Sequence, residues 1–138
     1  MRAAETYVAL RILSESVPTQ ELIRTVALPP DKTWAVGDVR RGTTIKEVNN
    51  GIEFNLFSKE GVTLNNLLDK LFLRVESILG AISTLPASCE THVAGVIYSA
   101  DAPELFFDST VVTRLARCRA SVDIDLYQLD CGEGTGLG

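Results

Sequence analysis

Between residues 63 and 85 the apolar side chains recur at steps of three and four, which is the spacing of one face of an α-helix. Pro86 follows the last of them and cannot continue a helix. The pattern predicts one amphipathic helix over residues 63–85, about 34 Å long at the helical rise of about 1.5 Å per residue. We expect this helix to form the main part of the core. Its apolar stripe consists of Leu64, Leu67, Leu68, Leu71, Val75, Ile78, Leu79, Ile82 and Leu85.

Shorter runs rich in β-branched and aromatic residues predict strands at residues 6–13, 44–48, 52–57, 91–98 and 121–129. The sequence Asn49-Asn50-Gly51 separates the second run from the third. Asn-Gly between extended runs is a strong hairpin signal, because both turn positions need positive φ. Two further apolar stripes predict short helices at residues 19–28 and about 109–117. The predicted order is strand, helix, strand, strand, helix, strand, helix, strand.

Residues 5–18 (ETYVALRILSESVP) resemble residues 90–103 (ETHVAGVIYSADAP) at an offset of 85, and seven of the fourteen aligned positions are identical. The similarity indicates a duplicated strand-turn unit, and convergence of two unrelated strand-turn segments is the alternative. With the order of elements, it predicts an α+β fold that is ferredoxin-like or a duplicated βαβ sandwich. In either case a mainly antiparallel sheet carries the helices on one face.

The alternation of side chains along each strand assigns the two faces of this sheet. Val8, Leu10 and Ile12 are expected to face the helices, together with the aligned positions of the second copy. The opposite face mixes aromatic and charged side chains, so it needs water, a ligand or a second subunit over it. That open face is predicted to hold Tyr7, Arg11, Glu53, Asn55, Phe57, His92, Tyr98, Asp123, Asp125 and Tyr127.

The chain has 138 residues, 46% of them hydrophobic, which suits one domain with a core of its own. We expect a single α+β domain over residues 1–130 and a flexible, glycine-rich tail over residues 131–138. No apolar run approaches the ~20 residues that span a bilayer, and the first twenty residues lack the pattern of a secretion signal. The net charge of −5 opposes binding to nucleic acid. These features predict a cytoplasmic protein that binds neither membranes nor nucleic acid.

Recognisable catalytic and metal-binding motifs are missing from the sequence. The three cysteines have no CxxC spacing, which fits a reducing compartment better than a disulfide framework. His92 is the only histidine, so a zinc site is not expected. It aligns with Tyr7 in the repeat, which favours a half-exposed structural role. No nucleophile elbow, phosphate-binding loop or dinucleotide fingerprint occurs, so we predict no catalytic residue, metal or cofactor.

The predicted open face contains several candidate binding residues. Asp123 and Asp125 alternate on the last strand and point the same way, as a carboxylate pair for acid-base chemistry or a divalent cation would. A solvated strand face is the simpler interpretation of this pair. Arg11 on the same face could offset their charge. Glu53 and Asn55 complete the candidates on this face.

The segment TWAVGDVRRG, residues 33–42, supplies the other candidates. Arg40 and Arg41 could bind an anion, and Asp38 could act as an acid or orient an arginine. In a structural interpretation, Trp34 anchors the loop against the core, while Gly37 provides a backbone bend to which Asp38 bonds. We favour the structural role for Trp34 and Gly37 and leave both roles open for the two arginines.

The sequence PPDKTWAVGD, followed by the strand IEFNLFS, a long amphipathic helix and an apolar strand ending in IYS, resembles a bacterial family described as domain of unknown function 4279. The resemblance covers roughly residues 6–129. It is most specific at Pro30, Thr33, Trp34, Gly37 and Asp38. It implies a small bacterial α+β protein and implies no activity, cofactor or catalytic residue.

These observations favour a non-enzymatic interaction or ligand-sensing module that uses the open sheet face, as a homodimer or with another protein. A toxin-neutralising partner protein of the immunity type is one concrete version. The alternative is a small-molecule-binding protein or enzyme with a pocket at the loop from Trp34 to Arg41.

Overall fold

The computed structural model describes residues 4–59 and 62–129 of the chain. The predicted tail at 131–138, with Cys131, lies outside the described residues. The strands are β1 (Glu5–Ser14), β2 (Lys32–Trp34), β3 (Asn50–Lys59), β4 (Cys89–Ser99) and β5 (Ser121–Gln128). The helices are α1 (Thr19–Val26), α2 (Leu64–Arg74), the 3-10 helix η1 (Glu76–Ile78), α3 (Leu79–Ile82) and α4 (Ser109–Arg117).

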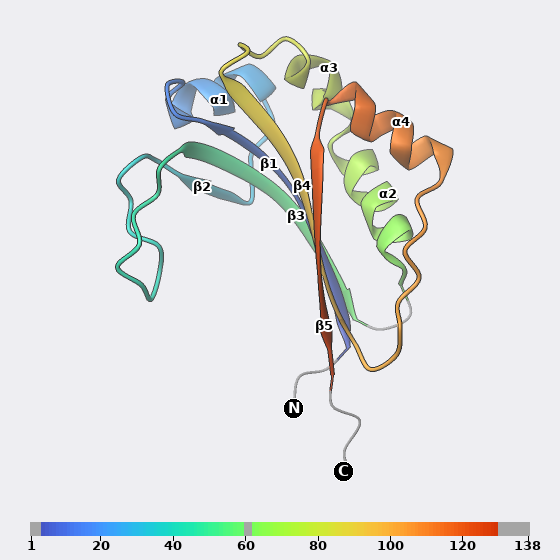
Figure 1. Cartoon of the computed structure of the whole chain (residues 1–138). Coiled ribbons are helices and arrows are strands. Elements are labelled where there is room, and N and C mark those ends of the chain that lie inside the picture. Colours follow the sequence, from blue (N-terminus) through green and yellow to red (C-terminus); the bar gives the residue numbers. More distant parts are fainter. Residues whose placement is uncertain (1–3, 60–61, 130–138) are drawn as a thin grey trace.

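The described strands form one sheet in the order β2-β3-β1-β4-β5. Strands β1 to β4 are arranged as in a ferredoxin-like fold, with each neighbouring pair antiparallel. Helix α4 then returns the chain to β5, which pairs with β4 in the parallel direction. The helices lie on one side of the sheet, and the sheet bends away from them (Figure 1). The predicted α+β class, with a mainly antiparallel sheet and helices on one face, is confirmed.

The core lies between the helices and the side chains that the sheet turns toward them. Leu10, Ile12 and Phe54 are fully buried there, opposite Leu68 and Leu71 of α2. Burial of a side chain of this size stabilises the fold by about 1.5–3 kcal/mol. The same parity continues on β4, where Val93 and Ile97 are 1% and 5% exposed. The opposite side of the sheet is consequently the open face.

The predicted hairpin at Asn49-Asn50-Gly51 is wrong. Asn50 and Gly51 begin β3, and the partner strand is β2, where Thr33 pairs with Ile52. Gly51 is not among the described residues with positive φ. It allows a close approach instead, because a Cβ at this position would lie 2.6 Å from the Trp34 indole Nε1 and nearer still to two ring carbons. Residues 44–48 belong to the β2–β3 loop, residues 35–49, which contains one isolated bridge between Val39 and Lys46.

The single helix predicted over residues 63–85 is also wrong in its continuity. Helix α2 ends at Arg74. Val75, its C-cap, has φ of −103° and ψ of 15°, and η1 and the four-residue α3 follow. The apolar residues nevertheless remain buried, from Val75 to Leu85. Several of their steps beyond Val75 are of three residues, which suits a 3-10 turn as well as an α-helix. The stripe therefore identified the buried face but not the break.

The two similar segments lie side by side in β1 and β4. The strands are antiparallel, and Ala9 pairs with Ala94, its own counterpart in the repeat. The segments are thus related by a local two-fold arrangement about this pair. The chain beyond them differs, because β3 lies between β1 and β2 whereas β5 is adjacent to β4.

No helix among the described residues combines the length and the apolar character that a membrane crossing requires.

Candidate functional site

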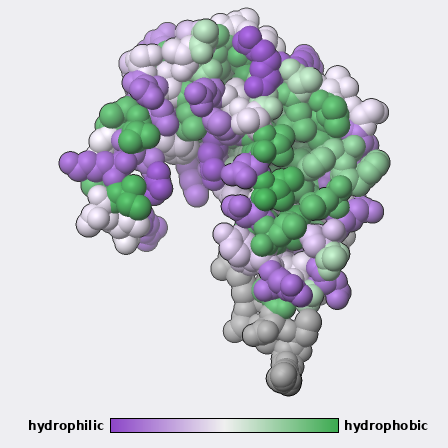
Figure 2. All heavy atoms as spheres, in the orientation of Figure 1, coloured by the Kyte–Doolittle hydropathy of each residue, from purple (hydrophilic) through white to green (hydrophobic). Residues whose placement is uncertain are grey.

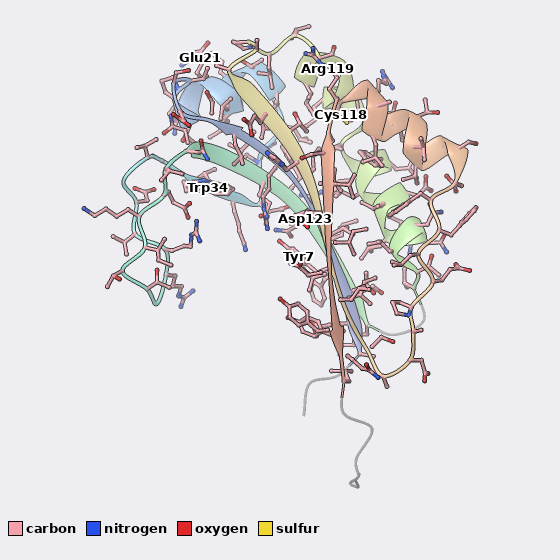
Figure 3. All side chains as sticks on the ribbon, in the orientation of Figure 1. Tyr7, Glu21, Trp34, Cys118, Arg119 and Asp123 are labelled. Atoms are coloured by element: carbon pink, nitrogen blue, oxygen red, sulfur yellow. The ribbon has the colours of Figure 1, made fainter. Side chains whose placement is uncertain are left out.

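The open face of the sheet is concave and mainly polar. Figure 2 shows the hollow beneath the bent sheet, lined largely by hydrophilic side chains. Figure 3 shows Tyr7, Trp34 and Asp123 on this side of the sheet. The register aligns Lys32, Glu53, Arg11 and His92 in one row across β2, β3, β1 and β4. Side chains from four strands are therefore presented together.

Glu53 is the centre of this face. It is 2% exposed although it lies on the open side, because its neighbours cover it. Its Oε2 accepts hydrogen bonds from the Tyr7 hydroxyl at 2.6 Å and from Asn55 Nδ2 at 2.7 Å. Its Oε1 accepts from Arg11 Nε at 2.7 Å, and Lys32 Nζ lies 3.7 Å from Oε2. We call these five residues the Glu53 network.

The network fixes the ionisation state of its members. Burial alone would raise the pKa of Glu53, but the hydrogen bonds from Tyr7, Arg11 and Asn55 outweigh it and hold that pKa below its ordinary value. Burial and the neighbouring carboxylate raise the pKa of Tyr7 to about 12. At neutral pH the carboxylate is charged and the phenol is neutral, which is the combination that the hydrogen bonds require.

The β2–β3 loop is held by bonds of its own. Gly37 has φ of 92°, a conformation that favours glycine, and the Asp38 carboxylate accepts a bond from Ala35 N at 2.8 Å. Arg40 pairs with Glu47 through Nε and Oε2 at 3.1 Å. The hydrogen bond to Glu47 and the charge of that carboxylate raise the pKa of Arg40 above its ordinary value.

Trp34 anchors this loop on the open face rather than in the main core. Its indole lies against Gly51, which pairs with it across β2 and β3. Its backbone carbonyl accepts a bond from the Thr19 hydroxyl at 2.6 Å. The side chain of Asn50 holds the loop as well, because its Nδ2 donates a hydrogen bond to Val17 O and its Oδ1 accepts one from Val36 N. The loop therefore starts and ends at fixed points beside the hollow.

The opposite side of the concave face is acidic. Asp123 and Asp125 lie on β5, across from Ala94 and Val96, and both are exposed. Neither takes part in any of the ion pairs found among the described residues. The face thus has cations on its β1 and β2 side and carboxylates on its β5 side.

Aromatic side chains occupy one end of the face. Phe57, which pairs with Tyr7, is 66% exposed. Tyr98 and Tyr127 stack with ring centroids 5.0 Å apart, and Tyr127 is 51% exposed. Such exposed aromatic area beside fixed charged groups is typical of protein-binding surfaces.

A separate pocket of about 380 Å³ lies where the first residues of β4 meet the ends of α3 and α4. His92 lies at its rim, where its ring nitrogens contact Glu90 Oε1 at 3.0 Å and the Ser121 hydroxyl. Cys118, which is buried in the pocket wall, has its pKa raised to about 11 by that burial. The contact between His92 and Ser121 could not be predicted from the sequence, because it depends on the parallel pairing of β4 and β5.

The structure brings together only part of the candidate set. Arg11, Glu53 and Asn55 are in direct contact. The two aspartates of β5 lie on the same face, separated from Glu53 of β3 by the two strands β1 and β4. Asp38, Arg40 and Arg41 belong to the loop, where Asp38 bonds within the turn, Arg40 pairs with Glu47, and Arg41 is exposed.

Two members of the Glu53 network were missing from the predicted site. The sequence predicts Tyr7 on the open face but not in the site, and it predicts no strand at residues 32–34, where β2 carries Lys32. Within residues 4–59 and 62–129, no group of three or more His, Cys, Asp or Glu side chains is arranged to hold a metal ion.

Comparison with known proteins identifies the family. A family model described as Domain of unknown function (DUF4279) matches residues 4–129, so the chain belongs to this family. No curated protein and no solved structure matches the chain.

Proposed function

We propose that this member of the DUF4279 family is a non-enzymatic binding module whose concave sheet face holds a protein partner. The observation that carries the proposal is the Glu53 network, in which a buried carboxylate holds Arg11 and Tyr7 in fixed positions on an open face. A partner that inhibits when bound, as in toxin neutralisation, is one version of this function. The cysteine pattern favours a reducing compartment such as the cytoplasm as its location.

The network reduces the cost of binding. Arginine and tyrosine carry much of the energy at protein interfaces, and long side chains lose conformational freedom when a partner immobilises them. Here Glu53 has already immobilised Arg11, whose side chain is 37% exposed, and Tyr7, which is half-buried. A partner would meet a rigid polar centre, with the exposed ring of Phe57 beside Tyr7 on the same face.

The charge distribution gives the face a direction. Lys32 and Arg11 lie on β2 and β1 of this face, and Asp123 and Asp125 lie on β5 at the opposite edge of the sheet. A partner with complementary charges can bind in one orientation and not in the reverse one.

Site-specific photocrosslinking in the native host tests the proposal. The photoreactive amino acid p-benzoylphenylalanine is placed at position 57 on the concave face. The matched control carries it at position 73 on α2, where Leu73 is 57% exposed on the helical side. We expect a discrete protein adduct from position 57 and none of that mass from position 73.

The same cells test whether the face itself recognises the partner. Asp123→Arg inverts a charge on the concave face at an exposed position, so the fold should be unaffected. The adduct from position 57 should weaken at least tenfold in this variant. The proposal would lose its basis if adducts formed equally from positions 57 and 73. It would also lose its basis if Asp123→Arg left the yield of the adduct from position 57 unchanged.

The pocket beside His92 supports a second candidate function, binding of a small molecule. It has apolar walls from Ile82, Leu85 and Pro86 and polar groups from His92 and Arg119, which is the usual make-up of a ligand site. Its location differs from the loop site expected from the sequence. A fragment screen by protein NMR tests it: bound fragments should shift the amide signals of Cys89 to His92, and a screen without such shifts would dismiss this function.

A further inference from the structure

Strand β5 ends the sheet with an edge that no other described strand covers. Its partner is β4, which pairs with all eight of its residues from Ser121 to Gln128. On the other edge, backbone N–H and C=O groups are available for pairing with a further strand. Eight residues in extended form present an edge about 26 Å long.

The helical side of β5 is also incompletely covered. Val122 and Leu126 turn to that side, yet they are 42% and 49% exposed, whereas Val93 and Ile97 on the neighbouring strand are nearly fully buried. Figure 2 shows an apolar area along β5 and over the adjoining helices. Val112 of α4 is 50% exposed as well.

Helix α4 is paired with α2 and η1 rather than with β5. Arg114 pairs with Asp69 of α2 at 2.8 Å, and Arg117 pairs with Glu76 of η1 at 3.2 Å. The sheet therefore extends beyond its helical cover by one strand. A further strand on β5 would extend the sheet and bury apolar side chains against Val122 and Leu126.

The concave side of β5 indicates which side chains a further strand on this edge must have. Asp123 and Asp125 both face this side, and no basic residue occurs on β5. Antiparallel pairing of two copies about Ile124 would place Asp123 opposite Asp125 in each half, and like charges in direct opposition destabilise a sheet. A strand with lysine or arginine at alternate positions would instead place a cation beside each aspartate.

We infer that β5 is the docking edge for a strand of a partner protein that alternates basic residues with apolar ones. The inference rests on the proposed function and adds the chemical class of the partner. The partner's basic side chains lie over the concave face beside Asp123 and Asp125, and its apolar side chains extend the apolar area of β5. Main-chain hydrogen bonds provide affinity, and the two aspartates provide selectivity.

Synthetic peptides test the edge with the full chain. The probe is an acetylated and amidated octapeptide with lysine at odd positions and valine or isoleucine at even positions. The control peptide has glutamate in place of each lysine. Binding is measured by calorimetry, and hydrogen exchange followed by mass spectrometry locates it. We expect the lysine peptide to bind at least tenfold more tightly than the glutamate peptide and to slow amide exchange in residues 121–128.

Charge inversion supplies the reciprocal test. The double variant Asp123→Lys/Asp125→Lys should bind the lysine peptide at least tenfold more weakly than the native chain does, and the glutamate peptide more tightly. Glu15→Lys/Glu21→Lys is the matched control, because it changes the net charge equally at exposed sites near α1. Its preference between the peptides should remain that of the native chain. Thermal unfolding of both variants verifies that they fold.

Several results would overturn the inference. They are failure of the lysine peptide to bind at about 1 mM, equal binding of both peptides, and binding without slower exchange in β5. Protection of β5 that grows with protein concentration in the absence of peptide would assign the edge to a second copy instead. If an adduct forms from position 57 while the peptides fail, the concave-face proposal stands and the edge assignment falls. Failure of both experiments removes both.

Discussion

Replacing Glu53 by glutamine is the most informative perturbation of the concave face. The substitution keeps the size of the side chain but removes its charge and replaces one acceptor oxygen by an amide donor. Oε2 accepts from Tyr7 and Asn55, and Oε1 accepts from Arg11. In either orientation of the amide, at least one of these donors faces the amide N–H group in place of an acceptor oxygen.

The expected cost follows from the burial of the pair. Removing one partner of a buried ion pair costs about 3–5 kcal/mol, because the remaining charge is left without compensation. The side chain of Glu53 is 3% exposed, but that of Arg11 is 37% exposed and can recover water. We therefore expect Glu53→Gln to lower the free energy of unfolding by about 2–3 kcal/mol at pH 7.

Urea unfolding followed by the fluorescence of Trp34, the only tryptophan, measures this loss. The pH dependence identifies its cause. Because the folded-state pKa of Glu53 lies below its ordinary value of 4.5, the carboxylate stabilises the fold fully above that value. That stabilisation is lost as the pH falls through the folded-state pKa. The difference between the native chain and Glu53→Gln should therefore shrink as the pH falls below about 4.

Two results would refute this reasoning. A loss below about 0.5 kcal/mol at pH 7 would mean that the network contributes no more than an exposed ion pair. A difference that stays constant down to pH 3 would mean that glutamine disturbs packing, and that the charge of Glu53 is not the source of the stability.

Four further predictions concern individual positions. The native chain should lose stability between pH 10 and about 12, because the raised pKa of Tyr7 favours the fold until the phenol ionises there. Tyr7→Phe should lack this alkaline loss of stability. Gly51→Ala should cost about 1–3 kcal/mol and shift the emission of Trp34, since the added Cβ displaces the indole. Ala27→Gly should raise the free energy of unfolding by about 0.5–1 kcal/mol, because Ala27 ends α1 with φ of 57°. Asp108→Ala should cost about 1–2 kcal/mol, because its carboxylate caps α4.

Urea unfolding checks all four, with alkaline titration added for the tyrosine. The first prediction would be contradicted if Tyr7→Phe lost as much stability at alkaline pH as the native chain. The second would be contradicted if the tryptophan emission of Gly51→Ala matched that of the native chain. A loss of stability in Ala27→Gly, or none in Asp108→Ala, would contradict the assigned cap geometries.

The fold was predictable where periodicity alone decides the structure. The stripe over 63–85 identified buried residues correctly, and the parity of residues 6–13 assigned the two faces of the sheet. The break at Val75 was not predictable, because spacings of three satisfy both kinds of helix. The hairpin at Asn50-Gly51 failed because the same glycine also serves a close approach by Trp34, which lies seventeen positions earlier in the chain.

The candidate site was predictable as a face but not as a set of contacts. Alternation placed Arg11, Glu53 and Asn55 on one side of the sheet, but the order of the strands decides which of them touch. Lys32 joins the network only through the short strand β2, which the sequence does not signal. Ser121 reaches His92 only because β5 pairs in the parallel direction with β4.

Hydroxyl-radical footprinting of the chain bound to its captured partner tests the central claim most directly. The method reports the solvent exposure of single side chains, and Phe57, Tyr127 and Leu73 are all at least half exposed in the free chain. We predict that the partner protects Phe57 and Tyr127 from oxidation and leaves Leu73 unchanged. Protection of Leu73 with full oxidation of Phe57 and Tyr127 would place the partner on the helices and contradict the account.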